Sequence, residues 1–414
     1  MDPDRCVHAT VSEAPAPRYA PSVPRPLQLA IFLVVVCALT AGLHRYVWVR
    51  LVRDTALPRP WRAIATWALG VLAVGIPGSF ALARLLPPSA ARVLVIPFYV
   101  WLGCLFFLML GLLLVDLGRG AAAIGRKARG APPPDHDRRQ LVARALGSAV
   151  ALGTVGLSAV SARAALGKVA VKDVTVPLAR LPAARAGFTI VQLTDVHIGP
   201  TLGRAWLERI VAQVNALAPD LVAITGDLVD GSVEDLLPAL EPLRALKSAH
   251  GTYFVTGNHE YYSGAEPWCR ALATLGVRVL RNERVAIGGD GADGFDLAGV
   301  DDFKAKGMAP GHGSDLPRAL AGRDPSRELV LLAHQPRAID EAAKLGVGLQ
   351  LSGHTHGGQL WPWTYLVYLQ QPYVRGLAKH ENTWIYVSQG TGFWGPPMRF
   401  NAPAEITKLT LQRG

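Results

Sequence analysis

Five short motifs rich in histidine and carboxylate residues could together bind metal ions. In chain order their candidate donors are Asp195 and His197, Asp227, Asn258 with His259 and Glu260, His334, and His354 with His356. Oxygen and imidazole donors without thiolate suit hard or borderline divalent metals. Two such metals held side by side favour attack of a metal-bridging hydroxide on a phosphate ester. The donor set therefore predicts metal-dependent hydrolysis of phosphate esters.

Each motif directly follows a short apolar run, which is typical of a strand buried on both faces. The expected strands cover residues 188–193, 220–225, 251–256, 329–333 and 347–351. Residues 203–218 show helical spacing, with apolar side chains on one face at Trp206, Ile210, Val214 and Leu217. In open α/β sheets, ligands bind beyond the carboxyl ends of the strands. The five motifs should therefore converge on one site.

The spacing within the motifs supports a shared site. Asp195 and His197 are separated by one residue, as are His354 and His356, so an extended backbone would point both members of each pair the same way. Three donors follow glycines that could allow sharp turns and close backbone approach, namely Gly226, Gly257 and Gly353. One such motif alone more often has a structural role, but five in this order favour a metal site.

These motifs resemble those of the calcineurin-like metallophosphoesterase superfamily, which read D-x-H, G-D-x-x-D, G-N-H-[ED], H and G-H-x-H. The matching stretches are Asp195-Val-His197, Gly226-Asp227-Leu-Val-Asp230, Gly257-Asn258-His259-Glu260, His334 and Gly353-His354-Thr-His356. The resemblance covers residues 188–412, and no ligand position is missing. Residues 353–359 and 388–397 are similar, more narrowly, to a bacterial membrane-associated branch. Its members are often labelled phosphodiesterases, and some resemble UDP-2,3-diacylglucosamine hydrolases.

The resemblance implies a fold, a ligand set and a catalytic role. The fold is α/β, with two mixed β-sheets sandwiched between helices. The first metal would take Asp195, His197, Asp227 and His356, and the second would take Asp227, Asn258, His334 and His354. Asp227 would bridge the two ions, as the two oxygens of a carboxylate allow. In the family, the histidine at the position of His259 is not a ligand but faces the phosphate. The donor set is compatible with Mn, Fe, Zn or Co and does not distinguish among these metals.

Charge is divided unevenly along the chain. Residues 1–170 carry 19 Lys and Arg against 7 Asp and Glu, whereas residues 171–414 carry 23 against 24. The expected catalytic region is therefore almost neutral and lacks the clustered positive charge of a nucleic-acid-binding face. Four cysteines, Cys6, Cys37, Cys104 and Cys269, form no spacing typical of a disulfide framework or a cysteine metal site.

Long apolar stretches lie in the basic N-terminal part. They cover residues 27–44, 64–83, 93–115 and 145–162, and the first three contain no Asp, Glu, Lys or Arg. Stretches of this length can cross a hydrocarbon core of about 30 Å. We therefore expect an all-α transmembrane region of about four helices in residues 1–170, followed by the metallophosphoesterase domain in residues 171–414. The fourth stretch is less hydrophobic, so a buried soluble helix is the alternative there.

Arginine in the loops predicts the orientation in the membrane. The loops after the first and third stretches carry most of it, and the loop after the second has only Arg84 and Arg92. The positive-inside rule then places the two rich loops in the cytoplasm and the catalytic domain outside the cytoplasmic membrane. Arg138-Arg139-Gln-Leu-Val and the later Ala162-Arg163-Ala164 also resemble an internal twin-arginine export signal. The alternative is that the arginine pair only anchors a cytoplasmic helix end.

Substrate and partners are less strongly indicated. Aromatic residues follow the last histidine motif at Trp361, Trp363, Tyr365, Tyr368 and Tyr373, with Trp394 further on. Such side chains favour membrane interfaces and could admit a lipid tail, or they could cover the sheet edge. Arg375 and Arg399 could meet a phosphate, although solvated surface positions are the simpler expectation. Histidines outside the motifs, such as His44, His136, His250, His312 and His380, are expected to be incidental or on the surface.

The leading hypothesis is a membrane-anchored phosphoesterase acting on a lipid-linked phosphate ester, such as a UDP-diacylglucosamine-like compound or a phospholipid. The bilayer is then a partner, and no nucleic acid is expected. A nucleotide phosphodiesterase or phosphatase is the alternative enzyme, because a neutral domain does not exclude mononucleotides. A non-catalytic metal-binding scaffold would be indicated by missing ligands. A transporter would be indicated by ionisable residues within the apolar stretches.

Overall fold

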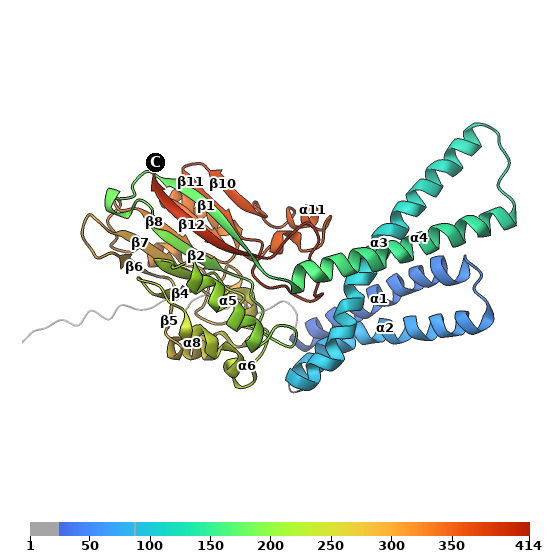
Figure 1. The fold of residues 1–414 in the computed structure, drawn as a ribbon, viewed down its shortest axis with the longest axis horizontal. Coiled ribbons are helices and arrows are strands. Elements are labelled where there is room, and N and C mark those ends of the chain that lie inside the picture. The colour runs from blue at the N-terminus through green and yellow to red at the C-terminus, as the bar shows by residue number, and fades with distance from the viewer. Residues whose placement is uncertain (1–24, 87) are drawn as a thin grey trace, which may run out of the picture.

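The computed structural model describes residues 25–86 and 88–414. Two six-stranded sheets form the C-terminal part, and four long helices form the N-terminal part (Figure 1). The first sheet has the order β1 (Ala170–Leu178), β12 (Glu405–Arg413), β2 (Thr189–Leu193), β3 (Leu221–Ile224), β4 (Thr252–Phe254) and β5 (Val277–Val279). The second has the order β10 (Gly376–His380), β11 (Thr383–Val387), β9 (Leu349–Ser352), β8 (Leu329–Leu332), β7 (Phe295–Gly299) and β6 (Glu283–Ile287).

Both sheets are mixed, which confirms the expected fold class. Strands β2 to β5 are parallel, whereas β12 runs antiparallel to β2. Strands β7, β8, β9 and β11 are parallel, whereas β6 and β10 are antiparallel to their neighbours. All five strands expected before the motifs are present as β2, β3, β4, β8 and β9. Their residues are buried, apart from the half-buried Thr189, as near-continuous apolar runs predict.

The sheets pack face to face over an apolar core. Phe295 and Tyr386 are among its largest fully buried side chains. Three helices, α5 (Arg204–Ala216), α6 (Val233–Leu240) and α8 (Ala265–Thr274), cover the other face of the first sheet. The second sheet is covered by α9 (Leu316–Ala319) and α10 (Ile339–Lys344). Helix α5 buries Trp206, Ile210 and Val214, so the expected helical face is confirmed.

The four N-terminal helices are α1 (Arg25–Trp48, continued as a π-helix over Val49–Arg53), α2 (Arg59–Leu85), α3 (Pro88–Ala128) and α4 (His136–Leu166). Each is long and apolar enough to cross a membrane. Large apolar side chains point outward from the bundle, and Trp67 and Leu152 are about three-quarters exposed, at 77% and 74%. Such a surface is stable in lipid rather than in water.

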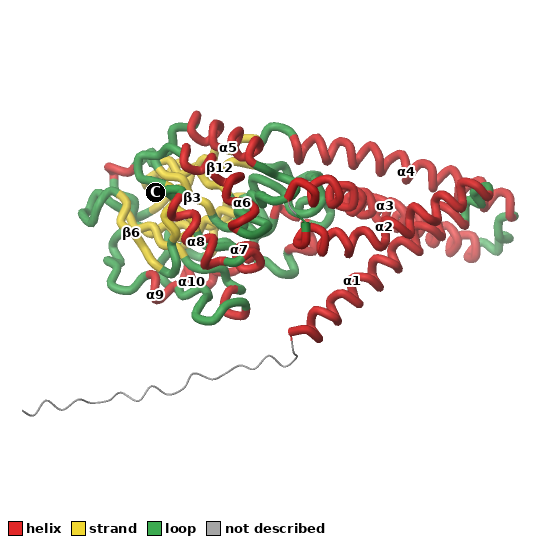
Figure 2. The backbone as a smooth tube through the Cα atoms, turned by 90° about the horizontal axis from the view of Figure 1, so that it is seen from below, coloured by secondary structure: helices red, strands yellow, loops and turns green. Residues whose placement is uncertain are grey.

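The helices extend beyond the apolar stretches that predicted them. Helix α4 begins at His136 because Asp135 caps it, accepting a hydrogen bond from the Arg138 amide at 2.7 Å. Hydropathy marks the part that can lie in lipid, whereas capping sets where a helix begins. The arginine-rich turns between α1 and α2 and between α3 and α4 lie at the bundle end away from the sheets (Figures 1 and 2).

Candidate metal centre

The expected donors gather where the carboxyl ends of the two sheets meet. Asp195 and His197 follow β2, Asp227 follows β3, and Asn258 begins α7 (Asn258–Ser263) after β4. From the second sheet, His334 follows β8, while His354 and His356 follow β9. The parallel strands thus bring together residues up to 161 positions apart in the sequence, as the strand-end rule predicts.

A first cluster consists of Asp195, His197 and His356. The Nε2 atoms of His197 and His356 lie 3.1 Å apart, and His356 Nε2 lies 3.3 Å from Asp195 Oδ1. Donor atoms bound to one metal at about 2.0–2.2 Å lie roughly 3 Å from each other. The spacing therefore fits a shared cation.

A second cluster consists of Asp227, His334 and His354. His334 donates from Nδ1 to the Thr225 carbonyl at 2.7 Å, which leaves Nε2 facing Asp227 Oδ2 at 3.0 Å. This orientation is typical of a histidine that ligates a metal through its other nitrogen.

Asn258 Oδ1 is buried at this centre with no hydrogen-bond partner among the described residues, and His334 Nε2 has Asp227 Oδ2 as its neighbour at 3.0 Å. Buried polar atoms are rarely left unpaired, because each costs about 1–3 kcal/mol. Asn258 Oδ1 and His334 Nε2 are both good ligands for a divalent cation. The residues present therefore fit bound metal.

The backbone at the donors is strained. Asp195, His197, Asp227, His354 and His356 all have positive φ, between 50° and 70°. Side chains other than glycine rarely adopt this region, at a cost of about 1–3 kcal/mol each, and such residues cluster at functional sites. The expected extended backbone in the two spaced pairs is therefore wrong. Left-handed residues turn each pair toward the metal centre instead.

The glycines before the donors are needed mainly for close approach. A Cβ atom on Gly257 would come within 2.2 Å of Asp227 Oδ1, and one on Gly353 within 2.2 Å of Asp195 Oδ2. Only Gly226, at φ 86°, has the left-handed conformation that a sharp turn requires. Substitution at Gly257 or Gly353 would thus displace a carboxylate at the centre.

His259 lies beside the two clusters and is held by Asp230. Its Nδ1 lies 2.5 Å from Asp230 Oδ1, and Asp230 also lies 3.2 Å from His197 Nδ1. Burial would lower the pKa of His259, but the carboxylates of Asp227 and Asp230 outweigh it and raise the pKa to about 9. His259 is therefore protonated at neutral pH in this structure, with Nε2 4.0 Å from Asp227 Oδ2.

Glu260 is a residue whose role the sequence did not reveal. Its buried carboxylate accepts hydrogen bonds from the amides of Asp227, Leu228 and Gly257, at 3.0, 2.8 and 2.6 Å. It therefore joins the loop after β3 to the loop after β4 and positions Asp227. The acidic fourth residue of the G-N-H-E motif was the available signal.

His354 and His356 are electrostatically suited to bind a cation. At His334, in contrast, burial would lower the pKa, but the carboxylates of Asp227 and Asp195 outweigh it and raise the pKa well above its usual range. Burial, together with the charge of His334, lowers the pKa of His354 to about 3. Burial also holds the pKa of His356 well below its usual range. Burial alone would raise the pKa of Asp227, but the neighbouring His334 and His259 hold it well below the usual value. Neutral imidazoles and an ionised carboxylate are the forms that bind metals.

Arg399 is not a solvated surface residue, so that expectation is wrong. It is 1% exposed and donates to the carbonyls of Gly392 and Ala402, each at 2.9 Å. One of its nitrogens also lies 3.3 Å from His356 Nδ1. Arg399 therefore supports the loop behind the first cluster, and burial lowers its pKa to about 10. Arg375 is exposed, as expected.

In residues 25–86 and 88–414, the histidines outside the motifs belong to neither cluster, and His8 lies outside the described residues. His136 is exposed, and His250, His312 and His380 are half-buried. His44 departs from expectation, because it is buried between α1 and α3 and accepts a hydrogen bond from Trp101 Nε1 at 2.8 Å. This hydrogen bond joins two helices that the hydropathy pattern predicts as separate membrane spans.

The aromatic residues after the last motif do not all cover the sheet. Tyr373 packs beside Ile385 and Val387, but Trp361, Trp363, Tyr365 and Tyr368 are exposed. They surround α11 (Thr364–Val367), which lies close to α3 in Figure 1. Apart from Tyr373, these exposed aromatic residues fit the expected apolar rim better than the alternative, in which they cover the sheet edge.

Comparison with known proteins bears directly on this arrangement. A family model for calcineurin-like phosphoesterases matches residues 188–358. The chain is 35% identical over 227 residues to an uncharacterized metallophosphoesterase of Aquifex aeolicus, covering 54% of this chain and 84% of that protein. The chain belongs to the calcineurin-like phosphoesterase family.

Relatives of this metallophosphoesterase occur in bacteria and in animals. It is 47% identical over 253 residues to a transmembrane protein with metallophosphoesterase domain of Bos taurus, covering 59% of this chain and 57% of that protein. It is also 47% identical over 227 residues to an uncharacterized metallophosphoesterase of Helicobacter pylori, covering 54% of this chain and 59% of that protein. The chain thus spans somewhat more than half the length of these relatives. The bacterial branch inferred from the sequence fits, although animal members share it.

Proposed function

We propose that this protein is a membrane-anchored phosphodiesterase that uses two metal ions to hydrolyse a lipid-linked phosphate ester. Such a substrate could resemble a UDP-diacylglucosamine compound or a phospholipid. The observation that carries the proposal is the convergence of six donors into two clusters, with Asn258 beginning α7 beside them, at one edge of the sheets. No position of the expected ligand set is occupied by a residue unable to ligate.

We assign the first ion to Asp195, His197, Asp227 and His356, and the second to Asp227, Asn258, His334 and His354. Bound there, divalent ions would supply an activated water as nucleophile and positive charge for the phosphate oxygens. Asp227 belongs to the second cluster, and we assign it to the first ion as well because the two oxygens of a carboxylate can bind two metals.

His259 is assigned to proton transfer or charge stabilisation at the leaving group. Asp230 fixes its Nδ1, which leaves Nε2 free to face the substrate. An imidazole held in this way can donate a proton from Nε2 as a general acid. Asp230 acts on the reaction only through His259 and His197, so it is a positioning residue.

The purified full-length protein, loaded with defined metals, tests this proposal. We expect metal-dependent hydrolysis of bis(4-nitrophenyl) phosphate, which Asp227→Ala abolishes together with metal binding. His259→Ala should lower turnover by about 10²–10⁴-fold while metal content stays nearly intact. His136→Ala, an exposed histidine on α4, is the matched control. Loss of bound metal in His259→Ala, or full activity without metal, would contradict the assignment.

We further propose that residues 1–170 anchor the enzyme and that residues 171–414 form the catalytic domain outside the cytoplasmic membrane. The arginine-rich turns at the bundle end away from the sheets support this orientation. A twin-arginine route is tested by Arg138→Lys with Arg139→Lys. If the signal is used, protease protection in spheroplasts should show the domain retained inside. Unchanged export would rule out the signal and leave the pair as a helix anchor.

A further inference from the structure

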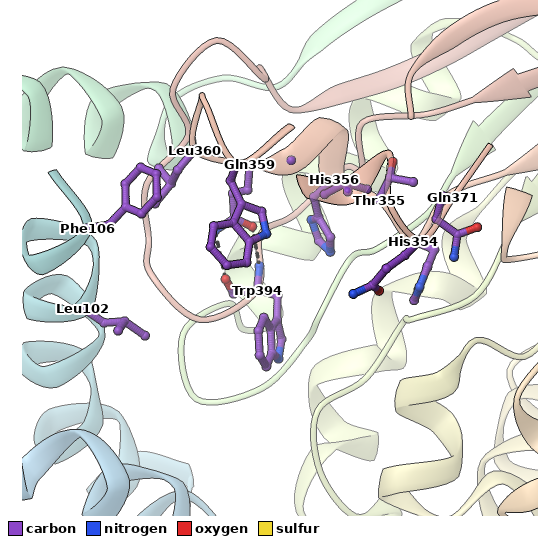
Figure 3. A pocket seen from close by; sticks show the side chains of 13 residues that line it. Leu102, Phe106, His354, Thr355, His356, Gln359, Leu360, Gln371 and Trp394 are labelled. Carbon is purple, nitrogen blue, oxygen red and sulfur yellow. Dashed lines mark hydrogen bonds between the residues drawn. The ribbon is translucent and has the colours of Figure 1, made fainter. Parts of the chain in front are cut away.

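A cavity of about 460 Å³ joins the metal centre to the membrane helices (Figure 3). One end is lined by His354 and His356, and the other by Leu102 and Phe106 of α3. Between them lie mainly apolar side chains and three glutamines, and apart from the two histidines no lining side chain is ionisable. These remaining lining residues are Thr355, Gly358, Gln359, Leu360, Trp363, Val367, Gln370, Gln371 and Trp394.

The wall that α3 contributes is fixed by close packing. Phe107 packs edge-to-face on Phe400, with ring centroids 5.7 Å apart. A Cβ atom on Gly103 would come within 2.5 Å of Met398 Sδ, so any larger residue there would require the Met398 side chain to move. Helix α4 is tied to the same loop, because the Arg399 amide donates to the Ser161 carbonyl at 2.9 Å.

Leu102 and Phe106 are one helical turn apart and so share a face of α3. They remain half-exposed, whereas Leu105, Phe107 and Leu108 beside them are buried. The two half-exposed residues face the cavity, and Phe106 approaches Trp363 edge-on, with centroids 6.4 Å apart. An apolar surface left open inside a packed interface is suited to an apolar ligand.

Exposed aromatic and apolar side chains lie on the cavity lining or close to it in the sequence. Trp363, on its lining, is 51% exposed, and Leu369, shortly after α11, is 81% exposed. Amphipathic aromatic residues favour the region between water and lipid. The cavity lining therefore extends from the histidines of the second sheet to α3 and includes an exposed tryptophan.

We infer that α3 forms part of the substrate site and selects for an alkyl chain. This inference rests on the proposed function. The ligand is an amphiphilic phosphate ester whose phosphate lies at His354 and His356. Its chain lies between Leu102 and Phe106 on one side and Leu360 and Trp363 on the other. The membrane region is then a specificity element as well as an anchor.

A series of alkyl 4-nitrophenyl phosphates, from methyl to octyl, tests the inference with the full-length protein in lipid nanodiscs. Hydrolysis adds water to phosphorus, breaks its bond to the nitrophenyl oxygen and releases 4-nitrophenolate and the alkyl phosphate. In the unmodified protein, kcat/KM should rise by about two- to fourfold per methylene until the cavity is filled.

Leu102→Trp fills the cavity, so it should flatten this rise in kcat/KM with chain length. Phe106→Ala removes part of the cavity wall and should also reduce the increase in kcat/KM per methylene. Leu113→Trp is the matched control, because Leu113 lies further along α3, is 52% exposed and does not line the cavity. The longer esters partition into lipid to the same extent with every variant. A difference between variants in the dependence of kcat/KM on chain length therefore reports on the binding site.

A second readout needs no turnover. An octylphosphonate with a photoreactive diazirine at the chain end should label the segment of α3 around Leu102 and Phe106, as read by mass spectrometry. Leu102→Trp should abolish this label. Failure of the unmodified protein to hydrolyse even the methyl ester would refute the proposed function. Hydrolysis with equal chain-length dependence in all variants would refute only the role of α3.

Discussion

At the residue scale, the centre combines ligands with side chains that hold them. Asp230 fixes two histidines, and Glu260 fixes the loop that carries Asp227. Arg399 holds the loop behind His356. Five donors with positive φ store backbone strain that these contacts must outweigh. The supporting residues should therefore affect stability and metal binding together.

We expect Arg399→Ala to destabilise the protein and weaken metal binding. Its guanidinium is buried and donates to several carbonyls, so truncation leaves those acceptors unpaired at about 1–3 kcal/mol each. The apparent Tm should fall by several degrees, and more metal should be needed for half-maximal activity. Arg375→Ala, on an exposed arginine, is the control. Equal Tm values for the two variants would contradict the role given to Arg399.

The reactivity of the Cys269 thiol at a fixed pH tests whether this side chain is buried. The thiol is buried on α8, and burial raises its pKa to about 12. Because the thiolate is the reactive form, a raised pKa keeps Cys269 protonated and inert at pH 8. In a protein with serine at the other three cysteines, alkylation by iodoacetamide at pH 8 should be at least about a hundredfold slower than in denaturant. Equal rates in the two states would show that the thiol is not buried.

At the element scale, α3 matters most, because it belongs to the membrane bundle and also contacts the catalytic loop. The contact is built from Gly103 and Phe107 on the helix and from Met398 and Phe400 on the loop. The turn after β11 thereby carries both the support for His356 and the docking surface for α3. A substitution in α3 should therefore alter the mobility of this loop.

We expect Gly103→Leu to loosen the loop, because the new side chain would collide with Met398 and Pro396. Backbone amides of residues 394–400 should exchange hydrogen for deuterium faster than in the unmodified protein. Gly118→Leu is the matched control, since a Cβ atom there meets no other atom within 4 Å. If both variants leave exchange in the loop unchanged, the helix does not support it.

At the scale of the whole molecule, stability should depend on bound metal. The centre joins both sheets, and Asn258 Oδ1 has no hydrogen-bond partner in the part of the chain that the structure describes. A ligand that binds only the folded state stabilises it by about 2.7 kcal/mol at a hundred times its Kd. Removal of metal by chelator should therefore lower the apparent Tm by several degrees, and added Mn²⁺ should restore it. A Tm independent of measured metal content would exclude a structural contribution.

Much of the fold was predictable, and the exceptions have physical causes. The strands before the motifs were expected because buried parallel strands read as continuous apolar runs. Strand β1 was missed because it alternates, with Lys172, Asp173 and Thr175 between apolar residues, and because it pairs with β12 from the far end of the chain. Such pairing depends on contacts that no local pattern records.

The sequence by itself determined the chemistry of the donors, their places at strand ends and the four apolar helices. These properties are local, because residue type, spacing and hydropathy depend only on short segments of the chain. Only the tertiary structure decided that the donors adopt left-handed backbone, that Arg399 is buried and that Leu102 and Phe106 face the metal centre. The reason is that conformation, burial and the wall of a cavity depend on segments distant in sequence, which meet only when the chain has folded.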